Sequence, residues 1–280
     1  MAEQLDKLAI IGAGLIGGAI GREAMKAFPG IEVVFYSRNY TSALKAVELG
    51  VGTGATASLE HCVKGADLVV IASPVRTFKS IFLKLKPFVT PQMQITDAGS
   101  TKSIVSDWAE EILGKGVFLG SHPIAGSEKN GIEHSGLVNL KGAKCVITPR
   151  NNSDRQIELV RHFWQSLGME VVLMDADKHD NMYAMLSHLP HAMAAALVQA
   201  TPDDMIEFAG SGFKDTTRIA EGGSDVWTDI FVTNSENMLD GIDRIIENLQ
   251  RLSFLIRNNY LEQLEQFFDE TSRKRKKINK

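Results

Sequence analysis

The chain has 280 residues, 44% hydrophobic and 23% charged, which is ordinary for a globular protein. Its formal net charge of −4 gives no reason to expect nucleic-acid binding. The two cysteines, Cys62 and Cys145, are too few for a disulfide framework and lack a CxxC spacing, which favours a reducing cytoplasm. The N-terminus lacks the pattern of a secretory signal, and no apolar run approaches the ~20 residues of a membrane span, so we expect no membrane association.

Short apolar runs alternate with helical patterns over the first half of the chain. The runs KLAIIGAG, EVVFYS, ADLVVIASP, MQITDAGS, FLGSHPIAG and KCVITPR are typical of buried strands, and IGGAIGREAMKAF and TSALKAVELG are typical of helices. This alternation predicts an α/β fold, a doubly wound parallel sheet of the Rossmann type with helices on both faces. A last strand is expected in MEVVLMDADKHD.

Strand patterns stop after about Asp177, and the remaining apolar residues recur with helical periodicity. We therefore expect an α/β domain over residues 1–177 and an all-helical domain over residues 178–280. The tail SRKRKKINK is strongly basic. We interpret it as a solvated, frayed end rather than as a functional basic patch.

The stretch IGAGLIGGAI places Gly12, Gly14 and Gly17 in a G-x-G-x-x-G motif. A lone motif is weak, but this one follows a strand and opens a helix, which is the context of a dinucleotide site. The alternative is a glycine-rich turn without a ligand. The predicted cofactor contacts are Gly12, Gly14, Leu15, Ile16 and Gly17, together with Ser73 and Pro74 at the end of a later strand.

The second strand ends in VVFYSRN, where an acid that would hold the adenosine ribose of NAD is absent. Ser37 is small and can donate a hydrogen bond, and Arg38 can pair with a 2′-phosphate; Asn39 follows them. We therefore expect NADP as cofactor, with NAD as the weaker choice. The alternative is that Arg38 is only a solvated loop arginine, and Arg22 and Lys45 are weak candidates for a second basic group.

Two strand ends carry polar residues, Ser100 in TDAGSTKS and His122 in GSHPIAGSEKNG. Carboxyl ends of strands in a doubly wound sheet face the ligand crevice, so both side chains are expected near the nicotinamide. A histidine there can take a hydroxyl proton as hydride leaves the same carbon. The alternatives are a loop histidine fixed by Pro123 and, for Ser100, a helix N-cap.

The segment SHLPH sets His188 and His191 three residues apart on one predicted helix. No cysteine or acid cluster completes a metal-ligand pattern, so we expect no metal site. Further along, GSGFKDTTRIAEGGSDVW supplies Asp215, Arg218, Asp225 and Trp227. Taken alone, Arg218 is more typical of a surface salt bridge than of a substrate anchor.

Together these motifs, in this order, resemble the prephenate and arogenate dehydrogenase family of tyrosine biosynthesis. The resemblance runs from about Lys7 to beyond Trp227, and SHPIAG, SHLPH and GFKDTTR carry it more specifically than the glycine loop. It implies oxidative decarboxylation of a cyclohexadienyl ring, with hydride passing to the nicotinamide and no metal required. It also implies that residues 1–177 form the dinucleotide-binding domain, and that the helical domain over 178–280 binds the substrate and forms an intertwined homodimer.

The resemblance further implies roles for individual residues. His122 resembles the catalytic histidine at the ring hydroxyl, Ser100 its partner there, and Arg218 the ligand of a substrate carboxylate. His191, and with it His188, resemble substrate-site residues. Glu128 and Asp215 resemble polar residues at the pocket entrance, and Trp227 resembles one that reaches the neighbouring subunit's site.

Asp225 bears on the choice between arogenate, which carries an ammonium group, and prephenate, which carries a keto group. It lies in a segment that resembles the one where arogenate-preferring relatives carry an acid, so we favour arogenate, with prephenate or both substrates as the alternative. Asp225 has a second interpretation, as a cap of the helix that begins near Trp227.

Two other classes of protein are less consistent with the sequence. The β-hydroxyacid dehydrogenases also join a glycine-loop domain to a helical one, but their lysine-containing helix motif is absent. A nucleotide sensor that retained the fold would bind NADP without turnover. We expect no chorismate mutase or regulatory segment beside the catalytic core.

Overall fold

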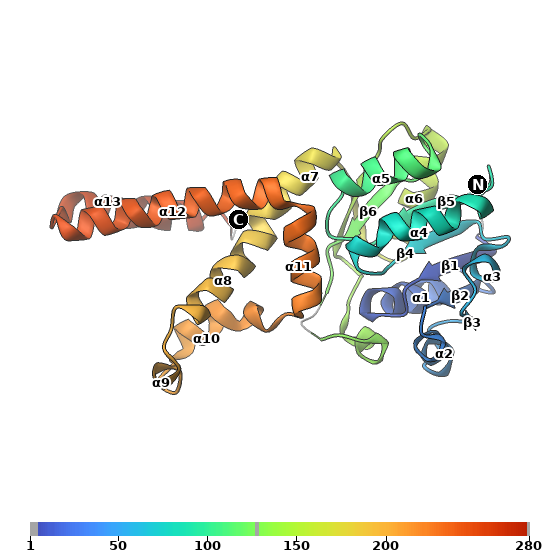
Figure 1. Cartoon of the computed structure of the whole chain (residues 1–280), viewed down its shortest axis with the longest axis horizontal. Helices are drawn as coiled ribbons and strands as arrows, with labels where there is room; N and C mark the ends of the chain where they lie inside the picture. Colours follow the sequence, from blue (N-terminus) through green and yellow to red (C-terminus); the bar gives the residue numbers. More distant parts are fainter. Residues whose placement is uncertain (1–4, 127–128, 279–280) are drawn as a thin grey trace. The chain divides into compact units, whose positions relative to one another are not determined.

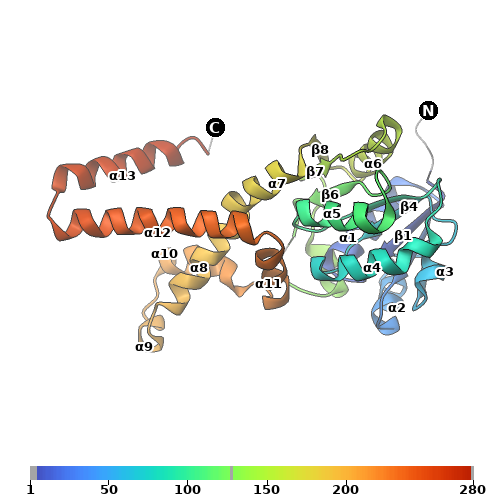
Figure 2. The same cartoon turned by 45° about the horizontal axis from the view of Figure 1, so that its top comes forward.

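The computed structural model describes residues 5–126 and 129–278 (Figures 1 and 2). Contacts within the chain divide it into two compact units, Met1–Ser235 and Glu236–Lys280. Among the helices in the described ranges, none has the length and apolar character that crossing a membrane requires.

A five-stranded parallel sheet forms the centre of the first unit, with strand order β3-β2-β1-β4-β5. The central position of β1 and the reversal of strand order beside it are the features of a doubly wound nucleotide-binding sheet. The predicted Rossmann-type fold is thus confirmed. The strands are β1 (Lys7–Ile11), β2 (Glu32–Tyr36), β3 (Gly54–Thr56), β4 (Leu68–Ile71) and β5 (Gln94–Asp97).

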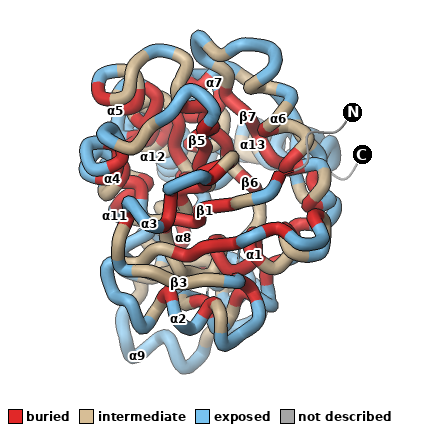
Figure 3. Tube along the Cα trace, turned by 90° about the vertical axis from the view of Figure 1, so that its right-hand side faces the viewer, coloured by how far each residue is buried: buried red, intermediate tan, exposed pale blue. Residues whose placement is uncertain are grey.

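Alternate residues of each strand pack into separate cores on the two faces of this sheet. In β1, Leu8 and Ile10 belong to one core, while Ala9 and Ile11 belong to the other. The buried tube along β1 and β5 in Figure 3 reflects this two-sided coverage. The first face is covered by α1 (Leu15–Ala27), α2 (Tyr40–Glu48) and α6 (Asp154–Ser166), the second by α3 (Leu59–Val63), α4 (Phe78–Leu85) and α5 (Ser103–Leu113).

A second sheet follows, with strand order β6-β7-β8. β6 and β7 pair antiparallel, whereas β7 and β8 pair parallel across the helix α6. The predicted parallel arrangement is therefore wrong for β6 and β7. The physical reason is their connection, a loop with the 3₁₀ turn η3 (Ile132–Leu137) against α1 instead of a crossover helix. The strands are β6 (Gly120–Pro123), β7 (Lys144–Thr148) and β8 (Glu170–Leu173).

The rest of the first unit is helical, as the periodicity predicted. A π-helical turn, η4 (Ala184–His188), interrupts the helix that the sequence suggested as continuous. Pro190 lies just beyond it and has no amide hydrogen for the carbonyl of Leu186, which favours the wider turn. The helices are α7 (Ala176–Tyr183), α8 (Leu189–Gln199), α9 (Asp203–Ile206), α10 (Ser211–Thr217) and α11 (Ser224–Thr233), and the 3₁₀ turns are η1 (Val75–Thr77), η2 (Lys86–Phe88) and η5 (Arg218–Glu221).

The second unit contains α12 (Ser235–Arg257) from Glu236 onward and α13 (Leu261–Arg275), and the two helices lie side by side (Figure 2). The Arg251 guanidinium lies 5.6 Å from the centre of the Phe267 ring, which ties the two helices together. The expected frayed tail is wrong in part, because α13 continues to Arg275. Its last turn carries Arg273, Lys274 and Arg275, and cations there stabilise a helix C-terminus.

Candidate active site

A cavity of about 600 Å³ lies in the first unit, where β1, β4, β5 and β6 end. The opposite wall comes from the helical segment, through η4, η5 and α11. Both halves of the sequence therefore contribute to one site. The predicted residues that line it are Gly14, Leu15, Ile16, Ser73, Pro74, Ser100, His122, His188, Arg218 and Trp227.

The glycine loop has the geometry that a pyrophosphate needs. Gly12 has φ +122°, and a Cβ there would lie 2.3 Å from the Ala72 carbonyl oxygen, so only glycine fits. A Cβ at Gly14 would meet nothing within 4 Å, which leaves open space beside the backbone. Helix α1 starts at Leu15 with no side-chain cap, so its first amides are free to bind an anion. These residues fit a dinucleotide cofactor.

The residues at the end of β2 lie outside the cavity wall. Ser37 is half-buried and Arg38 is exposed, whereas the Asn39 side chain caps α2 by accepting from the Thr41 amide at 3.1 Å. The two weak candidates for a second cation differ. Arg22 donates to the carbonyl oxygens of Ser135 and Val138, at 2.6 and 2.8 Å, and is committed to the fold. Lys45 is exposed on α2.

Ser100 and His122 line the cavity together, as predicted from the two strand ends. Helix α5 begins at Ser103 with Lys102 at its N-cap position, so the alternative role of Ser100 as N-cap is not what the structure has. The backbone amides of Lys102 and Ser103 instead donate to the Asp180 carboxylate, at 2.8 and 2.9 Å. Ser100 is thereby left on the cavity wall.

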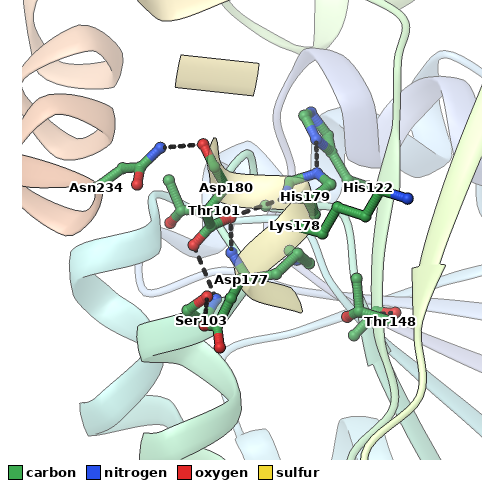
Figure 4. Close-up of polar contacts among 12 residues, drawn as sticks. Thr101, Ser103, His122, Thr148, Asp177, Lys178, His179, Asp180 and Asn234 are labelled. Atoms are coloured by element: carbon green, nitrogen blue, oxygen red, sulfur yellow. Dashed lines mark hydrogen bonds and ion pairs between the residues drawn. The ribbon is translucent and has the colours of Figure 1, made fainter. Parts of the chain in front are cut away.

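His122 contacts a second histidine on the side away from the cavity. Its Nδ1 atom lies 2.8 Å from Nε2 of His179, and Nδ1 of His179 lies 2.7 Å from Oδ1 of Asp180 (Figure 4). His179 and Asp180 belong to α7 and are buried. The Tyr183 ring, one turn further along α7, packs edge-on against His122. The three polar side chains form one hydrogen-bonded chain that ends at the cavity.

The surroundings of His122 keep its imidazole neutral. Burial is the largest cause that holds the pKa of His122 well below its usual value, and His179, Lys102 and His188 add to it. Burial likewise lowers the pKa of His188 to about 4, with nearby Asp180 opposing. A neutral imidazole at the cavity is the form that accepts a proton.

A buried ion pair supports the strand that carries His122. The Lys102 ammonium pairs with the Asp97 carboxylate, and both side chains are 0% exposed. Lys102 Nζ also donates to the Ser121 carbonyl oxygen at 2.8 Å, and the Ser121 amide donates to Asp97 at 2.9 Å. Since Ser121 precedes His122 in β6, this pair fixes the backbone at the candidate base.

Aromatic side chains form the far wall of the cavity. The Trp227 indole stacks on His191, with ring centres 3.5 Å apart and planes at 11°. His191 is buried behind Trp227 and is not among the residues that line the cavity. His188 does line it, and its Nδ1 lies 3.4 Å from the side-chain nitrogen of Asn234. Within this chain Trp227 faces its own cavity, so its reach to a neighbouring subunit stays a prediction.

The structure separates the charged candidates. Arg218 lines the cavity from η5, whereas Asp215 is exposed on α10 and does not line it. Asp225 is exposed in the first turn of α11, a position where an acid stabilises a helix N-terminus. Glu128 lies outside the described residues. Of the carboxylates in the described ranges, Asp229 lines the cavity, and it pairs with Arg76.

Sequence reasoning did not identify four of these residues, Lys102, His179, Asp180 and Asp229. The adjacent pair in the segment DADKHD was a visible signal for His179 and Asp180. Nothing in the sequence relates that pair to His122, because the contact joins residues 57 positions apart.

Comparisons with known proteins identify the family of the whole chain. The model of the prephenate dehydrogenase nucleotide-binding domain matches residues 20–173, and that of the prephenate dehydrogenase dimerization domain matches residues 175–270. Prephenate dehydrogenase from Bacillus subtilis (strain 168) is 31% identical over 277 residues, which cover 96% of this chain and 75% of the relative.

Two solved structures extend the likeness to the whole chain. Prephenate dehydrogenase from A. aeolicus, in complex with hydroxyphenyl propionate and NAD+, has a TM-score of 0.91 and 34% identity, and the match covers 99% of this chain and 100% of that one. Synechocystis arogenate dehydrogenase has a TM-score of 0.82 and 28% identity, covering 97% and 99%. The family models span the chain from α1 into α13, and the observed fold agrees with them. This chain belongs to the prephenate and arogenate dehydrogenase family.

Proposed function

We propose that this protein catalyses the oxidative decarboxylation of a cyclohexadienyl substrate in tyrosine biosynthesis, with hydride transfer to NADP. The observation that carries the proposal is the position of His122. It lines the same cavity as Ser100 and the glycine loop, and a buried hydrogen-bonded chain holds its Nδ1 side. A base so placed suits a reaction in which hydride and proton leave one hydroxyl-bearing carbon.

The chain's own residues supply acid–base chemistry and positioning. A bound nicotinamide cofactor would accept the hydride from the ring carbon that bears the hydroxyl. His122 takes the hydroxyl proton at Nε2 and returns it to the same oxygen when the ring carboxylate leaves as carbon dioxide and the ring becomes aromatic. Ser100 hydrogen-bonds that oxygen, and Arg218 binds one of the two carboxylates of the substrate.

NADP is our proposal for the cofactor because the end of β2 offers Ser37 and the exposed Arg38 where an acid is absent. Arg22 is engaged with backbone carbonyls, so Arg38 would bind a 2′-phosphate without its help. NAD is the second candidate, since the A. aeolicus structure contains NAD+.

The charged residues near the cavity bear on the preferred substrate. Asp225 is the residue that favours arogenate, but it is exposed and does not line the cavity of the single chain. Asp229 does line it, yet its charge is offset by Arg76. Use of both substrates therefore stands beside arogenate, and prephenate alone is the remaining alternative.

The proposal also covers the oligomeric state, the cellular location and the domain boundary of the protein. We propose a homodimer formed by the helical part, which matches a dimerization domain, and a cytoplasmic enzyme. We place the domain boundary between residues 177 and 178, shortly after the last strand ends at Leu173. In the single chain, residues up to Ser235 pack with the nucleotide-binding sheet as one unit.

The decisive experiment measures kcat/KM on arogenate and on prephenate, each with NADP and NAD, for the wild type and Asp225→Asn. We expect turnover of at least one substrate with a preference for NADP, and a lower arogenate-to-prephenate ratio in the variant. Absence of turnover with all four combinations would reject the proposed function. An unchanged ratio in Asp225→Asn would remove this residue from substrate choice.

A further inference from the structure

The chain Asp180–His179–His122 defines which nitrogen of His122 carries a proton. The Asp180 carboxylate receives donors at both oxygens. The Lys102 amide and His179 reach Oδ1, at 2.8 and 2.7 Å, and the Ser103 amide reaches Oδ2 at 2.9 Å. An ionised carboxylate only accepts hydrogen bonds. Nδ1 of His179 must therefore be the protonated nitrogen that donates to Asp180.

The second link follows from the first. A neutral imidazole has one donor and one acceptor nitrogen, so Nε2 of His179 is an acceptor. The atom 2.8 Å from it is Nδ1 of His122, which must then carry the hydrogen. Nε2 of His122 therefore keeps its lone pair, and His122 lines the cavity.

We propose that His179 and Asp180 are positioning residues that hold His122 as the Nδ1–H tautomer, so that Nε2 is the atom that receives the substrate proton. This proposal rests on the proposed function of His122. When Nε2 takes the hydroxyl proton, the imidazolium still donates from Nδ1 to His179, so no proton has to move along the chain.

The proposal requires His179 to be neutral. If it carried both protons, its Nε2 would donate to Nδ1 of His122. The hydrogen of the neutral His122 ring would then lie on Nε2, which could no longer accept the substrate proton. Burial lowers the pKa of His179, the ion-paired Lys102 acts in the same direction, and Asp180 and Asp97 oppose them. Tyr183 packs against the same ring, with centres 4.6 Å apart, and shields it from solvent.

Two substitutions of His179 distinguish its hydrogen bond with Asp180 from its hydrogen bond with His122. In His179→Asn the side-chain amide lies where Nδ1 was and still donates to Asp180, but nothing accepts from His122. In His179→Gln the side-chain oxygen reaches the place of Nε2 and still accepts from His122, while the contact with Asp180 is lost. Both variants remove the ring, so a role in packing alone predicts similar losses.

We expect kcat to fall by ~10²-fold or more in His179→Asn, the scale of a lost general base, with a clearly smaller loss in His179→Gln and little change in KM. His61→Asn, on the exposed surface of α3, is the matched histidine control and should keep the wild-type kcat. Equal losses in the two His179 variants, or a larger loss in His179→Gln, would overturn the proposal.

A nitrogen NMR spectrum of the ¹⁵N-histidine-labelled protein tests the tautomer without turnover. We expect His122 to show a protonated Nδ1 and an unprotonated Nε2 at neutral pH in the wild type, and a loss of this preference in His179→Asn. A protonated Nε2 in an enzyme that turns over normally would refute the tautomer assignment alone. The expected spectrum in a protein inactive on both substrates would support the positioning role and refute the proposed function.

Discussion

Lys102 and Asp97 form an ion pair from which solvent is fully excluded, directly beneath the strand that carries His122. Removing one partner leaves the other as an uncompensated buried charge, which costs about 3–5 kcal/mol. We therefore expect Lys102→Met to lower the free energy of unfolding by about this amount. Urea denaturation measures it, with the same m-value used for variant and wild type. The double variant Lys102→Met with Asp97→Leu should recover part of the loss. A stable single variant would show that the pair does not support the fold.

His122→Asn tests the candidate base with little disturbance of its surroundings. The asparagine amide occupies the place of Nδ1 and still donates to His179, but it has no group at the place of Nε2. We expect turnover to fall by ~10²–10⁴-fold, with cofactor binding and melting temperature retained. Near-wild-type turnover would remove His122 from the mechanism.

The pH profile of the wild type is a second measure of the same base. Because burial, His179, Lys102 and His188 all lower the pKa of His122, the neutral form should persist well below its usual titration range. The acid limb of kcat/KM is expected below about pH 6.5. A limb above that value would contradict a depressed pKa of the base in the free enzyme.

Arg218→Ala should mainly weaken substrate binding, because Arg218 lines the cavity and its guanidinium is proposed to pair with a substrate carboxylate. We expect a loss of about 2–5 kcal/mol, seen as a rise in KM with a smaller effect on kcat. Arg218→Lys, which keeps the charge but not the planar fork, should fall between wild type and alanine. An unchanged KM in the alanine variant would exclude Arg218 as the carboxylate ligand.

Ser37→Asp with Arg38→Ile should shift the cofactor preference from NADP towards NAD. The new carboxylate can accept from both ribose hydroxyls, and the cation that pairs with a 2′-phosphate is removed. Ratios of kcat/KM with the two cofactors measure the shift, and each single variant serves as a control. A wild-type enzyme already more efficient with NAD would contradict the NADP proposal.

His188 makes the stability of the fold depend on pH. Its pKa is about 4 in the folded protein, so between pH 4 and its ordinary value of 6.5 the unfolded chain binds more protons. The free energy of unfolding should therefore fall as the pH is lowered through this window, by about 3 kcal/mol for this group. His188→Asn keeps an acceptor towards Asn234 and should reduce the pH dependence. Identical pH dependence in variant and wild type would refute this assignment.

The sequence by itself determined the local chemistry of this protein. Strand and helix periodicity predicted the doubly wound sheet and the helical second half, because the faces that an element buries set the spacing of its apolar residues in the sequence. The glycine loop could also be predicted from the sequence, because the backbone geometry that requires Gly12 and Gly14 is set by residues close to them in the chain. Ser100 and His122 followed from the rule that strand ends in such a sheet meet at the ligand crevice.

Only the tertiary structure decided which distant groups act on those residues. The antiparallel pairing of β6 and β7 depends on how their connection packs against α1, and no periodicity records that. The contact of His122 with His179 joins residues 57 positions apart, on a strand and a helix that meet only when the chain is folded. A hydrogen bond of this kind is set by the distance between atoms in space, so the sequence supplied its partners without indicating that they meet.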